Sequence, residues 1–194
     1  MLDNSQLILP FIPEKNDGDT FIYTELLDRG KKKGNNGKRL LKTFYHRSQE
    51  EFLSQFETIK SFCEFNKIRA CTRLAPRSFK TVAKSFLRLV TETYITENYS
   101  GMKTLYSRAC GITKPIRKYW LIDVDEVNSS TLFLETPLRD QGILVATIPS
   151  KKGLHYIVNP FNLSGQFHAE FIKPLDLDIH KDNPTNLYIP DGAD

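Results

Sequence analysis

The chain has 194 residues, of which 40% are hydrophobic and 26% charged, and its formal net charge is +4. These values are typical of a globular domain, and the modest positive charge permits a nucleic-acid partner without requiring one. No apolar run approaches the roughly 18 residues of a membrane helix, and the amino terminus lacks the basic and apolar regions of a signal peptide. Three widely spaced cysteines (Cys63, Cys71 and Cys110) suit neither a disulfide framework nor a zinc site, so we expect a reducing, cytoplasmic compartment.

The first 20 residues contain the apolar segment LILPFIP and are expected to form an arm packed on the body or on a partner. Residues 21–194 are expected to form one α/β domain. Its first two strands, Phe21–Asp28 and Arg39–His46, flank a loop with Asn36-Gly37, a pair typical of a hairpin turn. The loop is either a solvated tip or a finger that contacts phosphates through Lys31, Lys32 and Lys33.

Helical patterns follow this hairpin. Ser48 with Glu51 three residues later predicts a helix start, and apolar residues then recur at helical spacing. This stripe is predicted to be core and comprises Phe52, Phe56, Ile59 and Cys63, widened by Leu53 and Phe62. Ser78 is predicted to cap a second helix that extends to about Ile95, and a short helix is expected from Met102 to Cys110, ended by Gly111.

Between the two long helices, residues 67–76 alternate between apolar and polar side chains, which predicts a half-buried strand. Arg69 and Arg73 then share one face, and Arg77 lies just beyond the strand. Guanidinium groups bind phosphate oxygens well, so the three arginines are candidates for nucleic-acid contact. Salt bridging is the equally open alternative.

The run LIDVDE is the strongest chemical signal. The five apolar or aromatic residues Tyr119 to Ile122 and Val124 predict a buried strand, and Asp123 and Asp125 lie two residues apart at its end, so both carboxylates point to one face. Like charges on one face repel, and a divalent cation with a preference for oxygen ligands would relieve that repulsion. A strand that simply ends in an acidic turn is the alternative.

Two further segments contain candidate residues. Strands Ile143–Ile148 and Leu154–Val158 flank a basic turn that places Ser150, Lys151, Lys152 and His155 together. A final strand, LDLDIH, offers Asp176, Asp178 and His180 on one face, before an extended tail. Strands and helices interleave, so we expect an α/β (α+β) fold with a mixed β-sheet and packed helices.

These three segments resemble, in order, the motifs of the archaeo-eukaryotic primase superfamily, and small phage and plasmid primase-polymerases are the most similar members. The matching residues are LIDVD (121–125), SKKGLH (150–155) and Leu177-Asp178. The resemblance implies an RRM-like catalytic core in which Asp123, Asp125 and Asp178 hold two Mg²⁺ or Mn²⁺ ions, with Asp176 as a competing third carboxylate. It also implies that the nucleotide phosphates are bound by Ser150, Lys151, Lys152 and His155.

The function implied is metal-dependent nucleotidyl transfer in DNA replication or repair, with a nucleoside triphosphate and a single-stranded nucleic acid as partners and a replication protein as a possible further one. A phage-encoded chain would act in the cytosol of a bacterial host. Two alternatives stay open: a nucleic-acid- or protein-binding module without catalysis on the same scaffold, and another metal-dependent phosphoryl chemistry. The latter includes a haloacid-dehalogenase-type phosphatase, which also begins with hhhhDxD and needs parallel β–α units afterwards.

Overall fold

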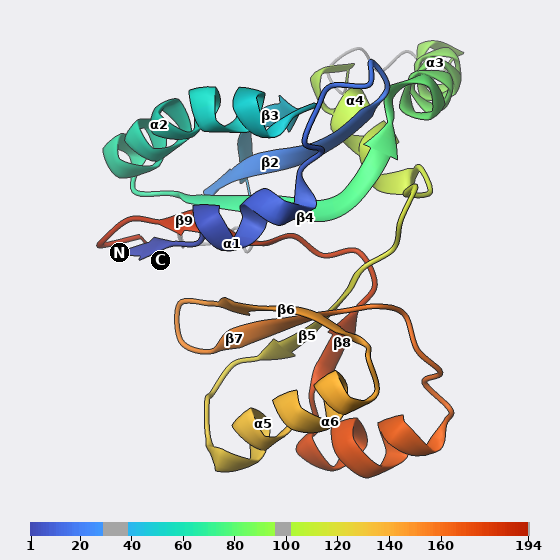
Figure 1. Ribbon diagram of the computed structural model, residues 1–194. Helices are drawn as coiled ribbons and strands as arrows, with labels where there is room; N and C mark the ends of the chain where they lie inside the picture. Colours follow the sequence, from blue (N-terminus) through green and yellow to red (C-terminus); the bar gives the residue numbers. More distant parts are fainter. Residues whose placement is uncertain (29–38, 96–101, 194) are drawn as a thin grey trace.

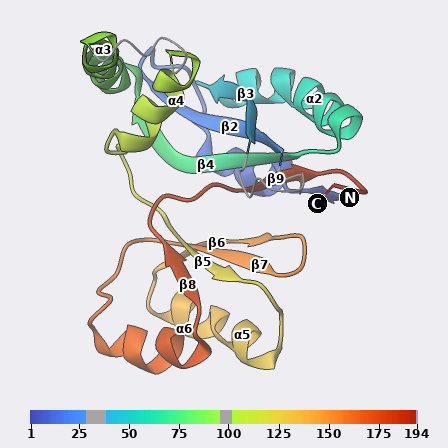
Figure 2. The ribbon, with the colours of Figure 1, turned by 180° about the vertical axis from the view of Figure 1, so that it is seen from behind.

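A computed structural model describes residues 1–28, 39–95 and 102–193. The described strands form two separate sheets, and each strand pairing within them is antiparallel. Figure 1 shows the two sheets one above the other, each with helices on its outer side, and Figure 2 gives the same arrangement from behind. The expected combination of helices and strands is confirmed at this coarse level, whereas a single mixed sheet is wrong.

The first sheet has the order β1-β9-β4-β2-β3. Its strands are β1 (Leu2–Asp3), β2 (Thr20–Asp28), β3 (Arg39–His46), β4 (Arg69–Ser78) and β9 (Thr185–Ile189). The predicted hairpin of β2 and β3 is confirmed, while its Asn36-Gly37 turn and Lys31, Lys32 and Lys33 lie outside the described residues. The prediction of an extended tail after β8 (Asp178–His180) is wrong, because Thr185–Ile189 form strand β9, which pairs with β1 and β4.

The second sheet has the order β6-β7-β5-β8. Its strands are β5 (Trp120–Val124), β6 (Leu144–Pro149), β7 (Leu154–Val158) and β8 (Asp178–His180). Two short helices lie between β5 and β6, and helical turns precede β8, so this half of the chain follows a β-α-β-β-α-β order. The helical segments are α5 (Ser129–Phe133), α6 (Glu135–Asp140), η3 (His168–Ile172) and η4 (Lys173–Leu175).

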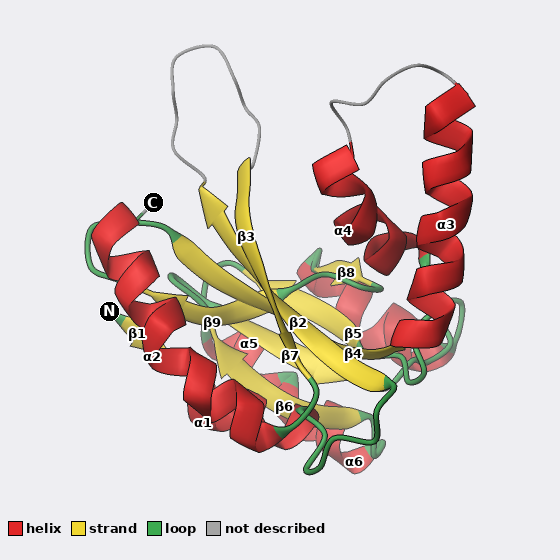
Figure 3. Cartoon of the chain, turned by 90° about the horizontal axis from the view of Figure 1, so that it is seen from above, coloured by secondary structure: helices red, strands yellow, loops and turns green. Residues whose placement is uncertain are grey.

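The remaining helices surround the first sheet (Figure 3). They are α1 (Ser5–Ile8), η1 (Leu9–Phe11), α2 (Gln49–Asn66), α3 (Phe79–Ile95) and α4 (Met102–Ile112). The predicted caps are present, since the side chain of Ser48 accepts a hydrogen bond from the Glu51 amide and that of Ser78 accepts one from Thr81. Helix α4 continues one residue past Gly111, which therefore does not end it.

One hydrophobic cluster joins the two sheets. The predicted α2 stripe packs there against the first sheet, and Leu121, Ile148 and Ile157 reach the same cluster from the second sheet. The prediction that Leu53 belongs to the core is wrong, because this residue is 50% exposed. A second cluster, which includes Ile122, lies between the second sheet and its helices.

The amino-terminal arm belongs to this core. Ile8 and Ile12 are buried in the cluster that joins the sheets. The side-chain amide of Asn4 donates to the carbonyl of Asn186 in the first sheet and to that of Pro149 in the second, each at 2.9 Å. The arm therefore helps to hold the two sheets together.

Candidate functional site

Strand β5, which carries the first predicted motif, pairs with the strands that carry the other two. Asp123 lies opposite His155 of β7 on one side and opposite Asp178 of β8 on the other. Residues directly opposite one another in an antiparallel pair share a face of the sheet. The three side chains therefore form one row across three adjacent strands, which we call the Asp123 row.

The Asp123 row faces the first sheet. Alternation along β5 puts Asp123 on the same face as Leu121, which packs in the cluster shared with the first sheet. Ile122 and Val124 point to the opposite face and pack against the helices of the second sheet. The Asp123 side chain is 33% exposed, so solvent reaches the row.

His155 is fixed on both ring nitrogens. Its Nδ1 atom forms a 2.7 Å hydrogen bond with the hydroxyl of Thr185 on β9, and its Nε2 atom lies 3.4 Å from Oδ1 of Asp123. The Thr185 contact crosses from one sheet to the other. A histidine held in this way has a defined orientation, and contact between Nε2 and a phosphate would require that atom to leave Asp123.

Asp125 and Asp176 occupy different positions relative to this row. Asp125 follows the end of β5 and is exposed, two residues beyond Asp123. Asp176 precedes β8 and has a left-handed backbone with φ of 50°, outside the strand. Asp178, the residue paired with Asp123, is therefore better placed than Asp176 to act with it.

The basic turn between β6 and β7 is closed by its own residues. The Ser150 amide donates to the Gly153 carbonyl, and the Gly153 amide donates to the Ser150 hydroxyl. The Lys151 ammonium donates to the Ala193 carbonyl at 2.6 Å, so it is directed toward the end of the chain. Lys152 is exposed. Of the four predicted nucleotide-binding residues, only His155 lies in the Asp123 row.

Gly153 has a structural role that the sequence alone did not indicate. A Cβ atom on this residue would lie 1.7 Å from the carbonyl oxygen of Val124 and 2.9 Å from the carbonyl carbon of Asp125. Only glycine permits this close approach. The turn thereby supports the backbone at the point where β5 ends and Asp125 begins.

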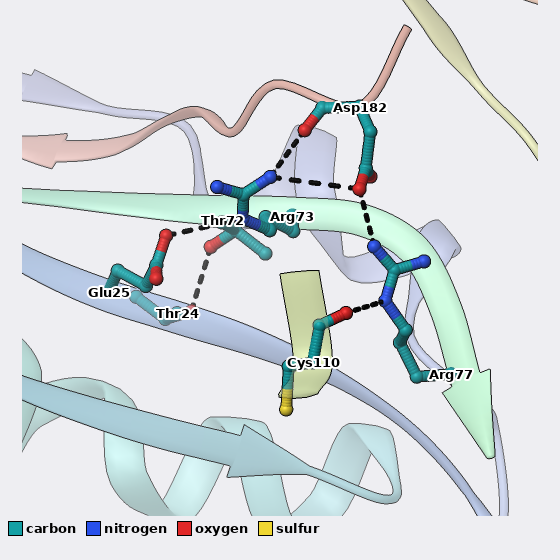
Figure 4. Close-up of polar contacts among 7 residues, drawn as sticks. All are labelled: Thr24, Glu25, Thr72, Arg73, Arg77, Cys110 and Asp182. Carbon is teal, nitrogen blue, oxygen red and sulfur yellow. Dashed lines mark hydrogen bonds and ion pairs between the residues drawn. The ribbon is translucent and has the colours of Figure 1, made fainter. Parts of the chain in front are cut away.

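Arg69 and Arg73 share a face of β4, as predicted, whereas Arg77 lies within the strand rather than beyond it. Figure 4 shows Arg73 and Arg77 converging on Asp182, in the chain between β8 and β9. Arg73 also pairs with Glu25 at 3.3 Å, and the Arg77 Nε atom donates to the Cys110 carbonyl at 2.8 Å. Arg77 is fully buried, so in this conformation its guanidinium group does not reach the surface where a nucleic acid would bind. Arg69 is half-buried at the start of the strand.

The donor chemistry of the Asp123 row fits a divalent cation. Carboxylate oxygens are the ligands that Mg²⁺ and Mn²⁺ prefer. Within the described part of the chain, no group of three or more His, Cys, Asp or Glu side chains lies close enough to hold a metal ion. An ion at this row would have Asp123 and Asp178 as its protein ligands and would need water or phosphate oxygens to complete its coordination, as Mg²⁺ commonly does.

Comparisons of the chain with protein-family models, with curated proteins and with solved structures found no match. Across the described residues, no helix combines the length and the apolar character that crossing a membrane requires.

Proposed function

We propose that this protein catalyses metal-dependent nucleotidyl transfer on a nucleic-acid template, with the Asp123 row as its catalytic centre. The observation that carries the proposal is the register of Asp123 with both His155 and Asp178. Three short motifs, separated by as many as 55 positions in the chain, thus contribute to one row of side chains. Opposed carboxylates on neighbouring strands destabilise a sheet, and a bound cation removes that cost.

The architecture around the row supports the proposal. The β-α-β-β-α-β order, the strand order β6-β7-β5-β8 and the helices on a single face are the features of an RRM-like sheet. An RRM-like primase-type core is therefore part of what we propose. The parallel β–α units needed by the phosphatase alternative do not occur among the described strands, because each of their pairings is antiparallel.

The residues of the row have distinct roles in this reaction. Asp123 and Asp178 would hold the divalent cation, and Asp125 follows the end of β5 two residues later. The bound ion supplies charge neutralisation at the transferring phosphate and lowers the pKa of the attacking hydroxyl. Thr185 orients the His155 ring, whose Nε2 atom is available to a phosphate oxygen when it is not paired with Asp123. Catalysis then depends on positioning and charge, as is general for phosphoryl transfer.

Primer extension tests the proposal. The wild-type protein, supplied with Mn²⁺ or Mg²⁺, nucleotides and a single-stranded template, is expected to incorporate nucleotides. The substitutions Asp123→Asn and Asp178→Asn together are expected to reduce incorporation at least about a hundredfold, whereas Asp176→Asn retains it. A folded double variant that incorporates as fast as the wild type would rule the reaction out.

A second candidate is a nucleic-acid- or protein-binding module without catalysis. Its support is that both ring nitrogens of His155 are occupied and that the described side chains form no three-ligand metal group. Calorimetry separates the two candidates. Heat of Mn²⁺ binding that is lost in the double variant favours the enzyme, and a wild-type protein without such heat favours the binding module.

A further inference from the structure

A basic groove lies away from the Asp123 row, between α3 and the chain that follows α4. It has a volume of about 400 Å³. The two helices lie side by side at one end of the first sheet (Figure 3). The polar residues that line the groove are Thr81, Lys84, Ser85, Arg88, Thr113 and Lys114.

The floor of the groove is ordered by its own contacts. The Thr113 hydroxyl lies 3.1 Å from the Ser85 hydroxyl on α3 and 2.7 Å from the Ala109 carbonyl on α4. Beneath them, Val82 and Leu89 of α3 pack in one cluster with residues of α4. The hydroxyl groups are therefore held in place before any ligand arrives, which lowers the entropy cost of binding.

The described lining of the groove is positively charged. It contains three cations and, among the described residues, no carboxylate. Arg88 forms an exposed ion pair with Glu92 at 3.6 Å, a type of contact that contributes little and is easily exchanged. Lys84 and Lys114 form no ion pair with any residue in the described part of the chain. Among the described residues, two ammonium groups and several hydroxyl groups thus line a space into which no carboxylate projects.

We propose that this groove binds the phosphodiester backbone of a single-stranded nucleic acid. Lys80, Lys84 and Arg88 follow one another at intervals of four residues on α3, and the helical rise separates them by about 6 Å each. A row of cations at that spacing suits a polyanion better than an isolated phosphate. The choice of a nucleic acid among polyanions rests on the proposed function. The Ser85 hydroxyl, which accepts from Thr113, keeps its own proton for a phosphate oxygen.

Salt-dependent binding tests the groove directly. Anisotropy of a fluorescein-labelled oligothymidylate is measured without divalent ions or nucleotides, for the wild type and for a Lys84→Gln, Lys114→Gln variant. Each phosphate contact on a single strand contributes about 0.7 to the slope of log K against log salt, so the variant slope is expected to be shallower by about 1.4. Between about 50 and about 200 mM salt, the wild type then loses roughly sevenfold more affinity than the variant.

The matched control is Lys15→Gln, Lys173→Gln, which removes the same charge from exposed lysines elsewhere. It is expected to keep the wild-type slope. Equal slopes for the two double variants would overturn the proposal. So would competition by millimolar inorganic phosphate as effective as that by the oligonucleotide, which would indicate a free-anion site. Groove-dependent binding to anionic vesicles instead of the oligonucleotide would indicate a membrane surface.

The oligonucleotide-binding experiment can fail independently of the test of the proposed reaction. The Asp123→Asn, Asp178→Asn variant is expected to bind the oligonucleotide with the wild-type salt slope, because the groove does not include the Asp123 row. If the Lys84→Gln, Lys114→Gln variant keeps the wild-type salt slope while nucleotide incorporation still depends on Asp123, only the proposal for the groove is rejected. Groove-dependent binding by a protein that never incorporates nucleotides rejects the reaction alone.

Discussion

Thr185 and His155 form a hydrogen bond of 2.7 Å that joins the two sheets at the Asp123 row. Thr185 is fully buried, and only 9% of the His155 side chain is exposed. A histidine of the second sheet thus takes its orientation from a strand of the first sheet. The geometry of the candidate site therefore depends on how the sheets pack as well as on the strands that carry the carboxylates.

Substitution of Thr185 by valine tests this dependence. Valine keeps the shape of the side chain but leaves the buried Nδ1 atom without its partner, which costs about 1–3 kcal/mol of unfolding free energy. Urea unfolding measures that loss, and the ¹⁵N shifts of His155 report a change in its tautomer populations. Thr185→Ser restores the hydroxyl and is expected to recover both. Unchanged ring shifts in the valine variant would show that Thr185 does not orient His155.

Gly153 is expected to tolerate no side chain. Gly153→Ala places a Cβ atom against the Val124 carbonyl, so the turn must move away from the end of β5. Forced overpacking of this kind typically costs about 1–3 kcal/mol. The matched control is Gly111→Ala, where the added atom meets nothing within 4 Å inside α4 and is expected to stabilise the helix by about 0.5–1 kcal/mol. Urea unfolding of both variants checks the opposite signs, and equal effects would contradict the close contact.

Local sequence patterns were enough to predict strand β5, which carries Asp123, and the β6–β7 hairpin, which carries His155. They also predicted a strand at Asp178. Strand β9 escaped prediction because all five of its residues are buried, so it has no alternation between apolar and polar side chains. Its polar Thr185 and Asn186 instead form hydrogen bonds inside the protein. The burial of Arg77 was also hidden, because its partner Asp182 lies 105 positions away and meets it only after the two sheets pack.

The ion pair between Arg77 and Asp182 is expected to be a major contributor to stability. Asp182→Asn leaves the fully buried guanidinium without its carboxylate, and breaking one side of such a pair costs about 3 kcal/mol or more. The double variant Arg77→Met, Asp182→Asn is expected to cost less than the sum of the single changes, because the buried Arg77 charge is then removed together with its partner. Denaturant unfolding of the three variants measures the coupling. Additive costs would show that the pair does not act as a unit, and the exposed control Asp140→Asn should stay within about 0.5 kcal/mol of the wild type.

Asp178 is expected to have opposite effects with and without a divalent cation. In the absence of metal, Asp178→Asn removes a carboxylate opposite Asp123 and should stabilise the fold by about 0.2–1 kcal/mol. With Mn²⁺ at a hundred times its dissociation constant, the wild type should gain about 2.7 kcal/mol that the variant lacks. Unfolding curves with and without Mn²⁺ measure both effects. Asp176→Asn is the matched control, since Asn tolerates the left-handed backbone there, and an Mn²⁺ response lost in Asp176→Asn but kept in Asp178→Asn would reverse the assignment.

His46 is expected to make the fold sensitive to acid. Burial lowers its pKa from 6.5 to about 4, and its Nε2 atom is hydrogen-bonded to the Thr24 hydroxyl at 2.8 Å. Between these two pH values the unfolded chain binds more protons than the folded one. The contribution of His46 to the unfolding free energy is therefore fully present above pH 6.5 and is lost as the pH drops toward 4. The total loss from this residue is about 3 kcal/mol.

Replacement of the imidazole isolates this contribution. His46→Phe cannot be protonated in either state, so its unfolding free energy should decline less than that of the wild type across the same pH range. Thr24 keeps its hydrogen bond to Thr72 at 2.8 Å in the variant. The control Tyr45→Phe should retain the wild-type pH profile, because burial raises the pKa of Tyr45 far from this range. Urea unfolding at several pH values provides the measurement, and parallel profiles for the wild type and His46→Phe would show that His46 is not the group responsible.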